Sequence, residues 1–170
     1  NFIDGDFVGD VDKTIYLFNT GINKGNQTDW PDQDTELGNA GQYVAVPIHT
    51  AVYLNNNYIP PMQGFYLLCR SAGTTTVTLN YERLVRNIGG ALSVNPTRAP
   101  KAEQTMPMLR IDVKGSHFSD KLYIFENEEQ TNDFDNGWDG YKFEGETYAP
   151  QLMTRTSDLD LAVDVSPAFS

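Results

Sequence analysis

Hydrophobic and polar residues alternate with a period of two along much of the chain, which is the pattern of β-strands. Residues 15–18 and 122–125 are apolar at every position and predict strands buried on both faces. Residues 76–81, 109–114 and 158–165 carry an apolar side chain at every second position, as half-exposed strands do. A helix would scatter the aspartates of 158–165 around its axis, whereas a strand places them on one side. No convincing amphipathic helix is present.

Turn-forming residues separate these segments. Examples are Asn-Asn-Asn at 55–57, Pro-Pro at 60–61, Gly-Gly at 89–90 and Asp-Asn-Gly at 135–137. Short strands joined by polar turns predict an all-β fold, namely an antiparallel β-sandwich of the jelly-roll kind. We expect residues 1–170 to form one module. Residues 95–104 are the one candidate sub-boundary, and we interpret them as a long crossover within the sandwich.

Composition narrows the class of protein. Of the 170 residues, 12 are basic and 23 acidic, so the net charge is −11, and phosphate backbones would be repelled by most of the surface. Nucleic acid is therefore excluded as a partner. The longest apolar run, residues 64–69, has the length of a strand and is too short to span a membrane. Cys69, the single cysteine, has no partner for an intrachain disulfide and is expected to be buried at the end of that run.

Three segments in order carry a recognisable pattern. They are residues 13–20 (KTIYLFNT), residues 59–67 (IPPMQGFYL), and residues 120–125 (DKLYIF) followed by 133–143 (DFDNGWDGYKF). The chain resembles the β-rich region that precedes the C-terminal sorting domain in many large surface and secreted proteins of Bacteroidetes-type bacteria. Those proteins are associated with type IX secretion. The resemblance implies an extracellular, cell-surface location. The first residue is not Met, and we expect the sequence to be part of a longer processed chain, with neighbouring domains of that polypeptide as its first partners.

The acidic stretch around residue 137 is the best candidate for a metal site. Asp133, Asp135, Asp139 and Glu146 supply carboxylates around two glycines, and Ca²⁺ prefers such oxygen ligands on a tight loop. In the spacing of an EF-hand loop, however, Gly137 occupies the third ligand position, and no flanking helices are predicted. We therefore favour a hydrogen-bonded turn with no cofactor, and structural Ca²⁺ remains the alternative. The aspartates at 4, 6, 10 and 12 are interpreted as a solvated entry to the first long strand.

Exposed aromatic residues suggest carbohydrate binding, because sugar rings stack on indole and phenol faces. Trp30 lies in a polar loop and is the best candidate for an exposed ring, whereas Trp138 is expected to close one end of the sandwich. Tyr141 completes the candidate ligand-binding set, and tyrosines such as Tyr148 are further candidates.

Catalytic patterns are absent from the sequence. It contains no Gly-x-Ser-x-Gly elbow, no phosphate-binding loop and no His-Glu-x-x-His, and none of its acidic residues forms a recognisable catalytic pair. We therefore expect no enzyme. The leading hypothesis is a non-catalytic extracellular module that serves adhesion, display or spacing and contacts a glycan or a surface protein. The alternatives are a carbohydrate-binding module of a glycan-degrading enzyme, a hydrolase in its own right, and a self-assembling sandwich that pairs through free strand edges.

Overall fold

The computed structural model describes residues 2–19, 41–54, 59, 63–80, 106–115 and 118–169. A short 3₁₀ helix, η1 (Asp4–Asp6), precedes the strands. The strands are β1 (Phe7–Val8), β2 (Thr14–Asn19), β3 (Gln42–Pro47), β4 (Thr76–Val77), β5 (Met108–Lys114), β6 (Ser119–Glu126), β7 (Gly140–Tyr141), β8 (Thr154–Thr156) and β9 (Leu159–Ser166). The prediction of an all-β fold is confirmed, and the packed sheets are consistent with a β-sandwich.

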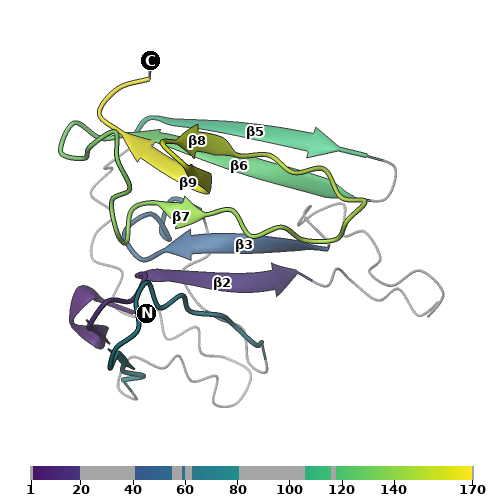
Figure 1. The fold of residues 1–170 in the computed structure, drawn as a ribbon. Coiled ribbons are helices and arrows are strands. Elements are labelled where there is room, and N and C mark those ends of the chain that lie inside the picture. The colour runs from purple at the N-terminus through teal and green to yellow at the C-terminus, as the bar shows by residue number, and fades with distance from the viewer. Residues whose placement is uncertain are drawn as a thin grey trace, which may run out of the picture.

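The largest sheet has the order β5-β6-β9-β7, with β8 also paired to β9. Its pairings are antiparallel except that of β6 with β9, which is parallel and joins strands separated by more than thirty residues of chain. The strands β2 and β3 form a second, antiparallel sheet, and β1 and β4 form a third. Figure 1 shows β3 beside β7, with β2 on the far side of β3 and β5 at the opposite edge of the molecule.

The β2–β3 sheet is a middle layer between two hydrophobic cores, and this explains its apolar sequence. Tyr16 and Ala45 are register partners that enter one core together with Phe125, Val163 and Val165 of the large sheet. Ile15 and Val46, the neighbouring partners, point to the other face and enter a second core with Phe7 and Val11. Successive side chains of a strand leave opposite faces, so a strand between two cores has to be apolar at every position.

Some strand predictions need correction. Residues 64–69 form no strand, because only single bridges link Tyr66 to Tyr16 and Cys69 to Val11. Among the described residues 76–80 of the predicted strand at 76–81, only the two residues of β4 are in a strand, and Leu79 is exposed. The strand at 109–114 is present as β5, but its apolar face is not covered. The candidate crossover at 95–104 lies outside the described residues, so the single-module prediction stays a prediction.

Candidate functional site

The loop between β6 and β7 contains most of the predicted site residues. It leaves β6 after Glu126 and returns at β7, and Asp133, Asp135, Trp138 and Asp139 all lie on it. The chain reverses at Gly137, whose φ of 92° is in the left-handed region that favours glycine. A side chain there would also meet the His49 ring, with Cδ2 only 3.0 Å from the added Cβ. The loop is thus held close to the end of β3.

The carboxylates of Asp135 and Asp139 accept hydrogen bonds from the backbone. Asp139 Oδ2 accepts from the amide of Asp135 at 2.7 Å, and Oδ1 accepts from the amide of Val165 in β9, also at 2.7 Å. Asp135 Oδ2 accepts from the amide and the hydroxyl of Thr131 at 2.6 and 3.0 Å. These contacts use the carboxylate oxygens to hold the turn, as the hydrogen-bonded-turn hypothesis expects.

Asp139 is 1% exposed, and its environment changes its acidity. Burial raises the pKa of Asp139 to about 7, although the amides of Asp135 and Val165 act in the opposite direction. A perturbed carboxyl of this kind often marks a catalytic acid or base. Here the carboxyl group is inaccessible to a substrate, and both of its oxygens accept hydrogen bonds from amides. The raised pKa of Asp139 therefore reflects its burial in the fold.

Asn136 connects the same loop to the N-terminal segment. Its Oδ1 accepts from the amide of Lys13 at 2.7 Å, and its Nδ2 donates to the carbonyl of Val11 at 3.0 Å. Thr14 Oγ1 donates to the carbonyl of Asp139 at 2.9 Å. The loop therefore joins the entry of β2 to β9, although these segments are more than 140 residues apart in sequence.

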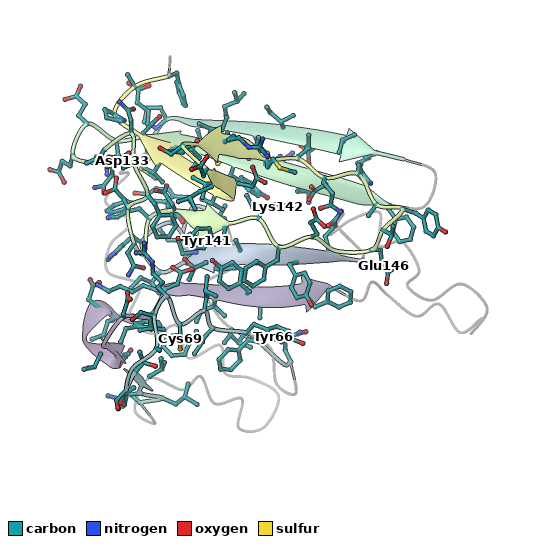
Figure 2. All side chains as sticks on the ribbon, in the orientation of Figure 1. Tyr66, Cys69, Asp133, Tyr141, Lys142 and Glu146 are labelled. Atoms are coloured by element: carbon teal, nitrogen blue, oxygen red, sulfur yellow. The ribbon has the colours of Figure 1, made fainter. Side chains whose placement is uncertain are left out.

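The predicted metal ligands do not gather at one point. Asp133 is exposed in the middle of the loop, whereas Figure 2 shows Glu146 at the other end of the segment that follows β7. Within the residues that the structure describes, no cluster of three or more histidine, cysteine or acidic side chains is placed to hold a metal ion. The EF-hand spacing counted along the sequence is thus not an arrangement in space, and the calcium hypothesis remains a prediction without geometric support.

The predicted aromatic platforms are partly covered by other rings. Trp138 stacks on His49 with ring centroids 4.9 Å apart and also packs against the first core. Tyr141 stacks on Phe134 at 4.4 Å, and the Arg70 guanidinium lies over the other ring of that pair, 4.9 Å from the Phe134 centroid. Trp30 lies outside the described residues. Neither described ring of the predicted ligand-binding set presents two open faces.

The more exposed aromatic residues lie elsewhere. Tyr148 is 89% exposed, and Tyr66, at 56%, extends an aromatic row with Tyr43 and Phe18. Tyr66 was not predicted as a surface residue, because its apolar neighbours indicated a buried strand. Cys69, in the same segment, is also exposed, which overturns the prediction of a buried thiol (Figure 2). A single-residue bridge links the backbone of each to the rest of the fold, and Cys69 Sγ lies 3.3 Å from Thr75 Oγ1.

The interpretation of the aspartates at 4, 6, 10 and 12 as a solvated entry to the first long strand is wrong for Asp6 and Asp12. Both are buried, and Asp12 is fully so. The Tyr16 hydroxyl donates to Asp12 Oδ2, and the Tyr16 oxygen accepts from the amide of Tyr141 at 3.2 Å. Burial raises the pKa of Asp12 to about 6, while the Tyr16 hydroxyl lowers it. An aspartate four residues before a tyrosine is too common a spacing to have indicated this contact.

A buried ion pair also escaped prediction. Lys142 Nζ lies 2.5 Å from Asp120 Oδ2, and both side chains are 1% exposed. The same oxygen accepts from the amide of Leu152 at 2.6 Å. These contacts join the start of β6 to the segments that flank β7 and β8. Removal of one partner would leave a buried charge uncompensated, which typically costs about 3–5 kcal/mol.

The described part of the chain has no helix long and apolar enough to cross a membrane. No family model and no solved structure matches the chain. Among curated proteins, the chain is similar to the Minor fimbrium subunit Mfa5 of Porphyromonas gingivalis, with 34% identity over 142 residues. The match covers 80% of this chain but spans only 11% of the length of that relative. The similarity to a fimbrial subunit from Bacteroidetes agrees with the resemblance to Bacteroidetes surface proteins.

Proposed function

We propose that the chain is a non-catalytic module of a fimbrial or fimbria-associated protein, displayed on the bacterial surface and serving in adhesion. The observation that carries the proposal is the 34% identity over 142 residues to a fimbrium subunit. The geometry is compatible with it, since the perturbed carboxyls Asp12 and Asp139 hold the fold together and are inaccessible to a substrate. Its immediate partners are then neighbouring domains and other subunits, and type IX sorting is one route to the surface.

The test replaces this segment in its parent protein by a flexible linker. Adhesion of cells to host-protein-coated surfaces should fall, while the truncated parent remains in the sheared fimbrial fraction. Replacement of another domain of similar size provides the matched control. Unchanged adhesion would contradict the adhesive role, and loss of the parent from the fimbrial fraction would instead assign the segment to assembly.

A polysaccharide panel separates protein adhesion from carbohydrate binding. The isolated segment should show no saturable binding, in buffers with or without Ca²⁺, because Trp138 and Tyr141 each have a face covered by another ring. Saturable binding that is lost in Trp30→Ala would revive the carbohydrate-binding hypothesis. Calcium-dependent binding that is lost in Asp133→Asn would revive the metal hypothesis.

A further inference from the structure

The outer edge of β5 carries polar backbone groups and apolar side chains that no described segment covers. In the large sheet β5 is terminal and pairs only with β6 among the described strands (Figure 1). Leu109 is 49% exposed and Ile111 39%, although both lie within a seven-residue strand. A long edge strand with exposed apolar side chains is a template for pairing with another strand. Natural proteins usually blunt such edges.

The hydrogen bonds between β5 and β6 show which residues of β5 direct their backbone N–H and C=O groups toward the outer edge. The carbonyl of Pro107 accepts from the amide of Glu126, and the amide of Gly115 donates to the carbonyl of Phe118, so the odd-numbered positions face β6. The register between β5 and β6 has no irregularity. The N–H and C=O groups of the even-numbered residues, Met108, Arg110, Asp112 and Lys114, therefore point away from β6.

The side chains of β5 have a nearly symmetric arrangement of apolar and charged residues about Ile111. On one face Leu109, Ile111 and Val113 are all apolar. On the other face Arg110 and Asp112 are neighbours of opposite charge, with Arg110 Nε 2.8 Å from Asp112 Oδ2. A strand centred on Ile111 is thus complementary to a copy of itself in the antiparallel direction.

We propose that β5 is a homodimerisation strand, which pairs edge to edge with β5 of a second copy around a twofold axis at Ile111. In this register Arg110 of each copy lies opposite Asp112 of the other, and these even-numbered residues exchange backbone hydrogen bonds. Ile111 meets its own counterpart in the closer, non-hydrogen-bonded type of pair, and Leu109 meets Val113. The two large sheets join into one continuous sheet with an apolar stripe on one face.

Charge selects this register over its neighbours. A shift of the axis to Arg110 places two arginines opposite each other. A shift to Asp112 places two aspartates opposite each other and Arg110 opposite Lys114. Like charges directly opposite are unfavourable, so the axis at Ile111 is favoured over both neighbouring axes. Ile111 is also the central residue of Met108–Lys114, so this register pairs the whole strand. The edge is therefore self-complementary, and this inference does not depend on the proposed function.

Charge exchange tests the proposal in sedimentation equilibrium on the whole chain. Because a single-strand interface is small, we expect a weak, concentration-dependent dimer. In homodimers of Arg110→Asp or of Asp112→Arg like charges lie opposite each other, so dimerisation should weaken by about tenfold or more in each. An equimolar mixture of the two variants restores both opposite-charge pairs and should recover the dimer as a heterodimer. A merely misfolded variant would not recover in this way.

Matched controls come from a second exposed ion pair far from β5 in the sheet order. Arg155 Nε lies 2.8 Å from Asp160 Oδ1, so Arg155→Asp and Asp160→Arg change the net charge by the same amounts. These controls should dimerise as the unmodified chain does. A chain that stays monomeric up to about 1 mM, a concentration at which even millimolar affinity shows, would overturn the proposal. So would a dimer that is insensitive to both β5 variants, or a mixture that fails to recover.

Discussion

Asp139 illustrates how one side chain organises a loop. Its two carboxylate oxygens accept separate amides from the loop and from β9, and its own carbonyl accepts from Thr14. One residue thereby joins the loop, β9 and the start of β2. Asp139 was also a candidate calcium ligand, although the hydrogen-bonded turn was the favoured interpretation. The sequence of a Gly-containing acidic loop is the same whether its carboxylate oxygens bind a cation or accept hydrogen bonds from amides.

Substitution Asp139→Asn should destabilise the fold by roughly 1–3 kcal/mol. The amide group of asparagine can accept only through its oxygen, so its NH₂ would face one of the two backbone donors. Urea unfolding at pH 8 would measure the change. Asp133→Asn is the matched control, since Asp133 is exposed, and it should leave the midpoint nearly unchanged. Equal midpoints for the two variants would contradict the role given to Asp139.

Cys69 allows a direct test of side-chain exposure. The exposed thiol should react with a chromogenic disulfide reagent in the folded protein, at a rate within about tenfold of that in denaturant. A buried thiol would react only after unfolding. Protection that disappears in urea would therefore restore the prediction made from the sequence.

At the scale of elements, close packing of β7 on β3 depends on a missing side chain. A Cβ on Gly140 would lie 2.8 Å from the Cβ of Ala45 and 3.3 Å from Cγ of Pro47. Both neighbours belong to β3, whose side chains are held between two cores. The strands cannot separate without loss of packing in both cores, so the glycine fixes the distance between β7 and β3.

We expect Gly140→Ala to lower the free energy of unfolding by about 1–3 kcal/mol through overpacking. Gly73→Ala offers a control, because a Cβ at Gly73 meets no atom within 4 Å and its φ is not in the left-handed region. Thermal unfolding of the two variants in parallel gives the comparison. A stability loss in both, or in neither, would show that the approach of β7 to β3 is not tight.

Four of the five long strands were predictable because their signal is local. Period-two alternation or a fully apolar run identified β2, β5, β6 and β9, whereas β3, although six residues long, was not predicted. The short strands β1, β7 and β8 have two or three residues each, too few for a period to appear. The alternation at 76–81 did indicate β4, which is only two residues long. The residues 64–69 have strand composition but remain a bridged segment, since strand pairing depends on a neighbour that the local sequence does not specify.

At the scale of the whole molecule, two buried carboxyls couple the fold to pH. Burial raises the pKa of Asp12 to about 6 and that of Asp139 to about 7, above the ordinary aspartate value. The folded protein therefore holds protons that the unfolded chain has lost. The stability linked to these protons is fully present below about pH 4 and is lost as the pH rises through 6 and 7.

Stability should therefore fall between pH 5 and pH 8, by roughly 1–3 kcal/mol for the two groups together. Differential scanning calorimetry at constant ionic strength would show a lower Tm at pH 8. In Asp139→Asn the pH dependence should be weaker, since one of the two titrating groups is gone. A Tm that rises with pH in this window would contradict the assignment of raised pKa values to these residues.

Local sequence pattern was enough to predict the class of fold, four of the five long strands and the acidic surface, because strand periodicity and charge are properties of local composition. Tertiary packing, in contrast, controls which polar residues are buried. Asp12, Asp120 and Lys142 have ionisable side chains that a sequence places at the surface, yet Asp12 is buried against the Tyr16 hydroxyl and Asp120 is buried in an ion pair with Lys142. It also decided that the alternating strand β5 stays uncovered. Both outcomes depend on which segments meet in space, and no local pattern encodes that.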